Sequence, residues 1–394
     1  MTPIRFQRGL PEREQRVATE IIRSVLRGAD PERAMRTHLS HMPKDTPTHI
    51  LAFGKASIAM CAGAMDALGS TFARATVLAP EANTLNTQFK SKLVALYPCD
   101  HPLPTERNIE ATKQLLEHAR SIPDDHRVLV LISGGASAML CHPQPRATLG
   151  QIRQITKDML ARGSSIQEIN AARSPLETLK AGGLAKELMH TTDRYCFLLS
   201  DVIGNDPSII GSGPMHDAFP PRTPYVIVAS NASALDAVAA WCAGASINCF
   251  HIDRGVTSES ADAGRSLAHR LARASFNAPT AVAIGGESTV NTHGAGGIGG
   301  PTLELTLSAS LALSEHDFDW SVIGFTTDGI DGPSGVAGCG LTASMLNAPI
   351  KRQGIESSLR HHDTLSICDT LGATIRTGPT GTNVNDIAIA IRWN

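Results

Sequence analysis

One pattern occurs six times along the chain and restricts the fold more than any other feature. A short apolar run is followed by a turn of Gly, Ser or Asp and then by an Ala-rich stretch. The apolar runs do not alternate with polar residues, which is typical of parallel strands buried on both faces. We therefore predict an α/β fold with a parallel sheet. The six segments are HILAFGKASIAM (49–60), VLVLISGGASAML (128–140), YCFLLSDVIGND (195–206), YVIVASNASALDA (225–237), TAVAIGGESTV (280–290) and SVIGFTTDGIDG (321–332).

The polar turns all follow the predicted strand ends. Open α/β sheets bind ligands beyond the carboxyl ends of their strands, so we expect the turns to converge on one or two clefts. A chain of 394 residues suggests two domains. We place their boundary near AHRLARASFNAP (268–279), which gives domains 1–270 and 271–394. Apolar residues at helical spacing also predict an amphipathic helix within residues 11–30.

Composition excludes several classes of protein. The chain is 42% hydrophobic and 18% charged with a net charge of −2, so we expect neither a broad nucleic-acid surface nor a membrane protein. The N-terminal residues lack the apolar core of a signal peptide. The eight cysteines include no CxxC pair, which is typical of a reducing compartment. We therefore expect a cytoplasmic protein whose partner is a small molecule.

Three cations lie in or near the predicted turns. Lys55 in FGKAS follows the first apolar run, where its ammonium group and nearby helix amides could bind a phosphate or a carboxylate. Arg173 and Lys180, in INAARSPLETLKAGGLA, would share one face of a continuous helix. The alternative for all three is an ordinary solvated side chain. Two cations near a Gly-Gly turn suit an acidic ligand.

A glycine-rich turn opens the stretch SGGASAML (133–140). Its backbone amides and hydroxyls could hold an anion. A tight strand–helix turn without any ligand would have the same sequence. No Walker A motif occurs anywhere in the chain, so a P-loop nucleotide site is excluded.

Carboxylates follow two of the apolar runs. Asp201 and Asp206 lie in SDVIGNDPSIIGSGP, and Asp328 and Asp331 lie in TTDGIDGPSGVAG. Magnesium needs only one or two protein carboxylates because it keeps several waters. Asp-Pro and Asp-Gly are also ordinary turn sequences. Two such clusters after two strands favour a metal site more than either cluster does alone.

Other motifs for catalysis or cofactor binding are weak or absent. His361 and His362 lie in a polar stretch and are expected to be exposed, and His101 before Pro102 fits an ordered loop as well as a ligand. No HExxH or GxSxG motif occurs. Carboxylates, amide-rich turns and cations without a nucleophile–base triad suit phosphoryl transfer.

A glycine fingerprint occurs late in the chain, at Gly294, Gly296 and Gly299. A dinucleotide fingerprint normally opens the first strand–helix unit of a Rossmann domain. This one follows the fifth apolar run, so we interpret the match as accidental. Pro301 directly after it fits the first position of a helix.

The order of the motifs resembles that of the class II glycerate kinase (glycerate 2-kinase) family, whose C-terminal part is the MOFRL domain. The resemblance extends from about residue 12 to 389. The matching stretches are FGKAS, HPLPTERN, LISGGASAML, IQEINAARSPLETLKAGGLA, SDVIGNDPSIIGSGP, GGESTVN, TDGIDGPSGVAG and TGPTGTNVNDIAI.

The resemblance implies a Rossmann-like parallel-sheet N-terminal domain and a smaller α/β C-terminal domain, with the active site in the cleft between them. It implies ATP and Mg²⁺ as cofactors, and transfer of the γ-phosphoryl group to the C2 hydroxyl of D-glycerate. Lys55 matches the family's active-site lysine, and Asp201 matches an aspartate that orients the hydroxyl or holds metal.

The remaining assignments follow the matching stretches. The metal candidates are Asp201, Asp206, Asp328 and Asp331. The substrate candidates are Arg173, Lys180, Glu287 and Glu304. The nucleotide candidates are Ser133, Gly134, Gly135, Ser137, Gly211, Ser212, Gly213 and Asn231.

The chain departs from the family pattern at two places. Pro301 stands where the family has an arginine, and Pro175 and Glu177 stand where it has a histidine and a serine. Proline supplies neither a charge nor an N–H group. Three hypotheses follow from the lost arginine: a different substrate, substitution by Arg173 or Arg254, or loss of catalysis.

Our leading interpretation is an ATP- and Mg²⁺-dependent kinase that acts on glycerate or on a related hydroxy acid or polyol. The alternative is a catalytically impaired homologue that binds a nucleotide or metabolite. An NAD(P)-dependent reductase is the third reading. The oligomeric state stays open, with a homodimer among the alternatives.

Overall fold

The computed structural model describes residues 3–84, 89, 91–162, 166–216, 223–274, 279–291 and 296–393. The chain forms two compact units. We call Asp30–Ser230 the central unit, and Met1–Ala29 together with Asn231–Asn394 the terminal unit.

These units do not follow the boundary that the sequence suggested near residue 270. The segment before that boundary belongs to the terminal unit, because strand β8 (Asn248–Val256) pairs in parallel with β9 (Thr280–Gly286). Helix α10 (Asn231–Gly244) also packs on α1 (Glu12–Gly28). Pairing between strands thus joins segments that a linear boundary separates.

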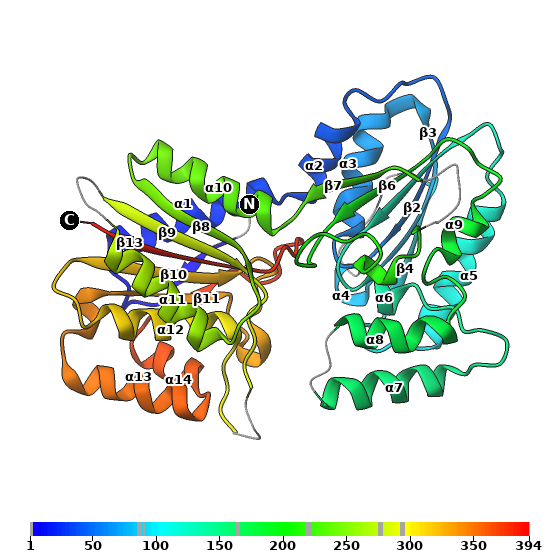
Figure 1. Ribbon diagram of the computed structural model, residues 1–394. Coiled ribbons are helices and arrows are strands. Elements are labelled where there is room, and N and C mark those ends of the chain that lie inside the picture. The colour runs from blue at the N-terminus through cyan, green and yellow to red at the C-terminus, as the bar shows by residue number, and fades with distance from the viewer. Residues whose placement is uncertain are drawn as a thin grey trace. The chain divides into compact units, whose positions relative to one another are not determined.

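The central unit is a parallel sheet of six strands (Figure 1). Its spatial order is β4-β3-β2-β5-β6-β7. Numbered within this sheet, that order is the 3-2-1-4-5-6 arrangement of doubly wound dinucleotide-binding folds, so the Rossmann-like prediction is confirmed. Four of the six apolar runs are strands here. The strands are β2 (Thr48–Phe53), β3 (Phe72–Pro80), β4 (Val94–Cys99), β5 (Arg127–Ile132), β6 (Arg194–Leu199) and β7 (Tyr225–Ala229).

Burial explains why these runs are strands. Every residue of β2 and β5 is buried, as expected when helices cover both faces of a parallel sheet. Segments that contain helices connect the strands. The helices of the central unit are α2 (Pro31–Leu39), α3 (Ser57–Leu68), α4 (Glu81–Thr84), α5 (Glu106–Arg120), α6 (Ala136–Met139), α7 (Leu149–Ala161), α8 (Ile166–Arg173) and α9 (Gly183–Glu187).

The terminal unit contains a seven-stranded mixed sheet in the order β1-β12-β11-β10-β13-β9-β8. Among the described residues, β8 and β9 pair in parallel, and the other neighbouring strands of this sheet pair antiparallel. The prediction of parallel pairing is therefore wrong for β10. The further strands are β1 (Arg5–Phe6), β10 (Trp320–Thr326), β11 (Gly338–Thr342), β12 (Thr374–Arg376) and β13 (Asp386–Arg392).

β13 explains this difference. It lies between β9 and β10 and is antiparallel to both, so those two strands still run in the same direction. Their carboxyl ends consequently meet the first residue of β13 at one edge of the sheet. The polar turns after β9 and β10 thus share that edge, although the strands that precede them are not neighbours.

Helices of the terminal unit include the predicted amphipathic helix, which is α1 and buries Val17, Ile21 and Val25. In the described part of the chain, no helix is both long and apolar enough to cross a membrane. The other helices are α11 (Ser260–Arg273), α12 (Pro301–Leu313), α13 (Pro349–His361) and α14 (Thr364–Thr370).

A chain of hydrogen-bonded histidines lies at the amino end of the central sheet. His49 Nδ1 lies 2.9 Å from His118 Nε2, and His49 Nε2 lies 3.0 Å from His126 Nδ1. The hydroxyl of Thr76 continues the chain at 2.9 Å from His118 Nδ1. Burial, with the nearby charges of His126 and Arg74, lowers the pKa of His49 to about 4. Burial, followed by the charges of Arg74 and His49, lowers the pKa of His118 to about 3.

We predict that acid destabilises the central unit through these two histidines. An unfolded histidine takes up its proton near pH 6.5, whereas the folded chain resists protonation, so stability is complete above pH 6.5 and falls as the pH drops. At pH 5.5, each of the two histidines lowers the free energy of unfolding by about 1.4 kcal/mol relative to its value at high pH. Urea unfolding at pH 7.0 and 5.5 measures it. His118→Gln should flatten the pH dependence, and exposed His38→Gln should not; equal slopes in all three proteins would contradict the prediction.

Candidate active site

The turns that follow β2 and β5 meet at the centre of the central sheet. Phe53 and Ile132, the last residues of these strands, are partners in the parallel register. The chain continues from β2 to β3 on one side, and β5 is followed by β6 on the other. This reversal of strand order is where open α/β sheets bind ligands. The predicted Lys55 and Ser-Gly-Gly turns are therefore the centre of the candidate site.

Backbone contacts join the two turns. The Lys55 N–H donates to the Gly134 carbonyl at 2.8 Å, and the Ala56 N–H donates to the Ser133 hydroxyl at 3.0 Å. Gly54 makes this approach possible: its φ is +122°, and a Cβ there would lie 2.4 Å from Ser133 Oγ. The structure thus brings together the predicted residues Lys55, Ser133 and Gly134.

The buried Ser133 hydroxyl holds the lysine turn, because it accepts the Ala56 amide and is 1% exposed. Lys55 is half-buried, and its carbonyl accepts a hydrogen bond from Asn83 Nδ2 at 3.1 Å. The role predicted for Ser133 in nucleotide binding stays a prediction. Its observed role is to position the residue that carries the charge.

A polar network extends the Ser-Gly-Gly turn. Ser137 Oγ lies 2.7 Å from Ser212 Oγ and donates to Asn170 Oδ1 at 3.0 Å. Gly211 lies against the same turn, since an added Cβ would be 3.1 Å from Ala136 Cβ. The adjacent Gly213 carbonyl accepts the Gly182 amide at 2.7 Å. The predicted nucleotide residues of the central unit, 133–135, 137 and 211–213, therefore belong to one cluster.

Arg173 and Lys180 lie beneath this cluster and not on a solvated face, which excludes the alternative raised from the sequence. Both side chains are buried around Glu177: Arg173 Nη2 lies 2.7 Å from Glu177 Oε1, and Lys180 Nζ lies 4.0 Å from Glu177 Oε2. Burial lowers the pKa of Lys180 to about 8, with Glu177 opposing the shift and Arg173 adding to it.

The same two cations support the backbone of α6. Arg173 Nη2 and Lys180 Nζ both donate to the Ser137 carbonyl, at 3.0 Å and 2.6 Å. Lys180 also donates to the Leu140 carbonyl at 2.9 Å. Direct contact with substrate, as predicted for both cations, stays a prediction. Their hydrogen bonds to backbone carbonyls stabilise the segment that follows the Ser-Gly-Gly turn.

His101, which the sequence left open between an ordered loop and a ligand, is a member of this site. A Cβ on Gly135 would lie 3.1 Å from His101 Cδ2 and 3.3 Å from Nε2. The imidazole therefore lies over the Ser-Gly-Gly turn. Surrounding protein atoms, and then the positive charge of Lys55, lower the pKa of His101 to about 4, although the residue keeps solvent-exposed surface. The ring is neutral at physiological pH.

The carboxylates of the central unit differ from one another. Asp201 is half-buried and follows β6. Asp206 is exposed and accepts hydrogen bonds from the Ser208 N–H at 2.8 Å and from its hydroxyl at 2.7 Å. Those two bonds lower the pKa of Asp206. Asp206 thus closes a turn, as the alternative drawn from the sequence allowed, and the metal-binding role predicted for Asp201 stays a prediction.

A second polar cluster occupies the edge of the terminal sheet where β9, β13 and β10 meet. Asp386, the first residue of β13, pairs with Gly286 on one side and with Thr326 on the other. Burial, followed by the charge of Asp331, raises the pKa of Asp386 well above its usual range, while the Thr326 hydroxyl opposes the shift. Sequence reasoning missed Asp386, because nothing in TGPTGTNVNDIAI marks that carboxylate as buried.

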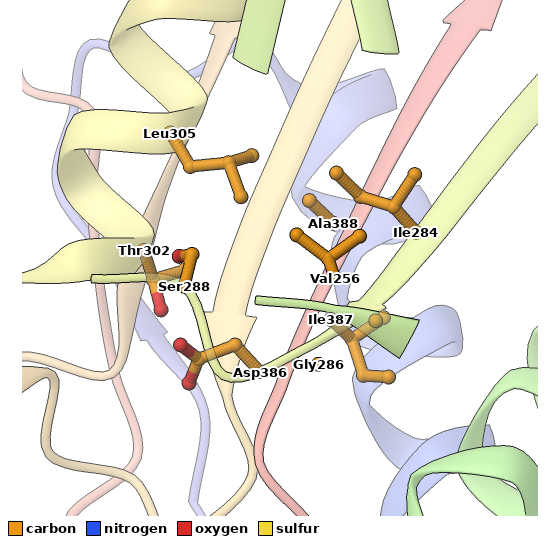
Figure 2. Close-up of a pocket in the computed structure, with 10 residues that line it drawn as sticks. Val256, Ile284, Gly286, Ser288, Thr302, Leu305, Asp386, Ile387 and Ala388 are labelled. Atoms are coloured by element: carbon orange, nitrogen blue, oxygen red, sulfur yellow. The ribbon is translucent and has the colours of Figure 1, made fainter. Parts of the chain in front are cut away.

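Asp386 also lines a small pocket of the terminal unit. Figure 2 shows the Asp386 carboxylate and the hydroxyls of Ser288 and Thr302 on one side of this pocket, with apolar side chains around the rest. The cavity is about 10 Å³, which is roughly the room that one water molecule needs. It is too small for a nucleotide or a hydroxy acid.

Asp331 has a structural role in the same cluster. Its carboxylate accepts the amides of Thr302 at 3.0 Å and Leu303 at 2.9 Å, so it caps the first turn of α12. Burial raises the pKa of Asp331 to about 6 against these hydrogen bonds. Asp328 accepts the Ile330 amide at 3.1 Å. Helix α12 begins at Pro301, which confirms that prediction for the proline.

Glu304 and Asn231 are tied to the protein itself. Glu304 Oε2 lies 2.9 Å from His362 Nδ1, so the prediction that His362 is exposed is wrong, whereas His361 is exposed. Asn231 Nδ2 donates to the Val384 carbonyl at 2.9 Å and to the Asp386 carbonyl at 3.1 Å. Ligand contacts by Glu304 and Asn231 stay predictions.

The terminal unit contains further residues that the sequence analysis named. Glu287 is exposed after β9. Arg254, a candidate substitute for the lost arginine, pairs with Asp236 at 2.6 Å. Gly294 lies outside the described residues. Gly299 packs against Thr364, whose hydroxyl would be 2.0 Å from an added Cβ; this contact within the chain accounts for that glycine of the fingerprint.

The predicted magnesium ion stays a prediction. Among the residues that the structure describes, no three His, Cys, Asp or Glu side chains lie so as to hold a metal ion. Magnesium is commonly held by one or two carboxylates together with substrate phosphates. Asp206, Asp328 and Asp331 each already accept a backbone amide, and the metal-binding roles predicted for them and for Asp201 stay predictions.

Comparison with known proteins gives a consistent result over nearly the whole chain. Residues 17–234 match the model of a domain of unknown function, DUF4147, and residues 280–386 match that of the MOFRL family. The chain is 28% identical to D-glycerate 2-kinase of Thermotoga maritima over 97% of this chain and 99% of that protein. It is 31% identical to a putative hydroxypyruvate reductase of Agrobacterium vitis over 86% of this chain and 97% of that protein.

A solved structure agrees with this. The crystal structure of the glycerate kinase from Thermotoga maritima superposes with a TM-score of 0.86 at 26% identity, over 97% of this chain and 100% of that one. The relatives support a phosphotransferase of the glycerate kinase type. The chain thus belongs to the class II glycerate kinase (glycerate 2-kinase) family, with a C-terminal MOFRL domain.

Proposed function

We propose that the chain transfers the γ-phosphoryl group of ATP, with Mg²⁺, to a hydroxyl of glycerate or of a related small hydroxy acid or polyol. The observation that carries this proposal is the join between the Lys55 turn and the Ser-Gly-Gly turn at the point where the central sheet reverses its strand order. The glycerate kinases among its relatives support a kinase and a small substrate of this kind.

Each residue of this site has a role that phosphoryl transfer requires. Lys55 places a positive charge where negative charge collects on the transferred group, and charge neutralisation with positioning is most of what such catalysis needs. The half-buried Gly135 contributes to a glycine-rich turn whose backbone amides can hold an anion. Asp201 orients the acceptor hydroxyl or holds the metal. Bound Mg²⁺ would neutralise phosphate charge.

Pro301 bears on the identity of the acceptor, because the family has an arginine at this position. The proline starts α12, and this position tolerates the missing N–H. Arg254 has its own partner in Asp236, and Arg173 is paired with Glu177. Because both arginines already have a carboxylate partner, these contacts do not favour either one as a replacement for the family's arginine. We therefore propose that the acceptor is a small hydroxy acid or polyol other than glycerate.

Pro301→Arg is expected to increase turnover with glycerate. The first position of α12 needs no helix hydrogen bond, so arginine should be accepted there without loss of the helix. A cation that stabilises the transferring group contributes ~10³–10⁵ in rate in related chemistry. Measuring kcat/KM for glycerate in both proteins tests the idea, with Pro349→Arg at the start of α13 as the control. A variant with unchanged specificity would contradict the role given to position 301.

One assay separates the proposed function from its alternatives. ADP release with ATP, Mg²⁺ and a panel of hydroxy acids and polyols is the expected result. Thermal stabilisation by ATP without turnover on any acceptor would instead indicate an impaired homologue that binds nucleotide. Oxidation of NADH with hydroxypyruvate would overturn both and would favour the activity named for the Agrobacterium vitis relative.

A further inference from the structure

His101 is held in place by a buried side chain and not by its own contacts alone. It follows β4, whose turn lies two strands away from that of β2 in the sheet. The fully buried Asn108 fixes Asp100, the residue before His101. The Asn108 side chain accepts the Asp100 N–H at 3.0 Å and donates to the Asp100 carbonyl at 2.9 Å. Asn108 also donates to the Ala138 carbonyl at 2.9 Å. One amide side chain thus ties the His101 loop to α6.

The imidazole then occupies the space over the Ser-Gly-Gly turn. Gly135 has a φ of +79°, and His101 Nε2 lies 3.3 Å from where its Cβ would be. A side chain at 135 would therefore fill the space that the ring uses. The loop after β4, the turn after β5 and the lysine after β2 converge on the same point.

The chemistry of the ring complements that of Lys55. A neutral imidazole has one N–H donor and one acceptor in fixed directions, whereas an ammonium group is a rotating point charge. The lysine alone attracts an anion, and the ring can fix the direction in which one oxygen of that anion points. His101 is exposed and therefore accessible to a ligand.

We propose that His101 is a substrate-binding residue, whose Nε2 donates a hydrogen bond to an anionic oxygen held beside Lys55 over the Ser-Gly-Gly turn. The ligand is a phosphate group of the nucleotide or the carboxylate of the acceptor, which share this oxygen chemistry. This inference rests on the proposed function and adds a recognition group to its site.

The test compares His101→Ala and His101→Gln with the wild type, with His38→Gln as the exposed control. A hydrogen bond to a charged group corresponds to about a 10- to 100-fold change in an equilibrium or rate constant. We expect His101→Ala to lose that factor in kcat/KM, and His101→Gln to recover part of it. A rise in KM for ATP assigns the bond to phosphate, and a rise in KM for the acceptor assigns it to the carboxylate.

The pH profile tests whether the neutral form of the His101 ring makes the contact. Because His101 is neutral, kcat/KM of the wild type and of His101→Gln should run parallel between pH 6 and 8. Unchanged kinetics in His101→Ala, with a folded variant and an active wild type, would overturn the inference. If the wild type shows no turnover, the proposed function fails, and calorimetric titration with inorganic phosphate then decides: weaker binding by His101→Ala supports the inference, and equal or absent binding overturns it.

Discussion

Lys55→Ala is expected to abolish measurable phosphoryl transfer and to leave the fold intact. The backbone of Lys55 makes the contacts that shape its turn, with its N–H on the Gly134 carbonyl and its carbonyl on Asn83. Truncating the side chain keeps both contacts. What is lost is the half-buried ammonium group, and a cation at a transferring phosphoryl group contributes ~10³–10⁵ in rate.

Steady-state ADP release measures this loss, and thermal unfolding verifies the fold. Lys44→Ala, which removes an exposed lysine of the same unit, should retain full activity. Lys55→Arg should recover only part of the rate, because a planar guanidinium has a different reach and geometry from an ammonium group. Turnover by Lys55→Ala at the wild-type rate would show that Lys55 is not an active-site residue. The contact between the two turns would then have no role in catalysis.

The sequence predicts the central unit well because its signal is local. Runs such as HILAF and VLVLI are buried on both faces, and no other element explains short apolar runs between glycine turns so simply. The terminal sheet was less predictable. β13 inserts between β9 and β10, and nothing in the local pattern of SVIGFT reports which strand will be its neighbour.

The residues of the site also divide into those that the local sequence predicts and those that it does not. Lys55 and Ser133 could be predicted, since each lies within two residues of the end of a strand, and the two strands end side by side. The burial of Arg173 and Lys180 could not be, because helical spacing gives a shared face without saying whether that face meets solvent or protein. The place of His101 over the Ser-Gly-Gly turn and that of Asp386 in its pocket depend on tertiary packing. The local sequence does not report that packing.

Glu177→Gln is expected to destabilise the central unit strongly, although it changes almost no volume. Glu177 lies between Arg173 at 2.7 Å and Lys180 at 4.0 Å, and all three side chains are at most 3% exposed. Removing one partner of a buried ion pair leaves uncompensated charge and typically costs ~3–5 kcal/mol. Urea unfolding should report a loss of that size. Glu187→Gln, which breaks the exposed pair with Arg120, should cost about 1 kcal/mol or less.

The pH dependence of this deficit distinguishes charge from packing. Without Glu177, the pKa of Lys180 should fall below its value of about 8, because the partner that opposes the shift is gone. The unfolded lysine keeps its proton until about pH 10.4. The unfolded chain then binds more protons than the folded chain, so the stability of Glu177→Gln should rise between pH 7 and 9.5. Adding Lys180→Met should restore part of the stability at pH 7, since it removes one buried charge. A deficit that is independent of pH and unchanged in the double variant would mean that Glu177 stabilises the site by shape and not by charge.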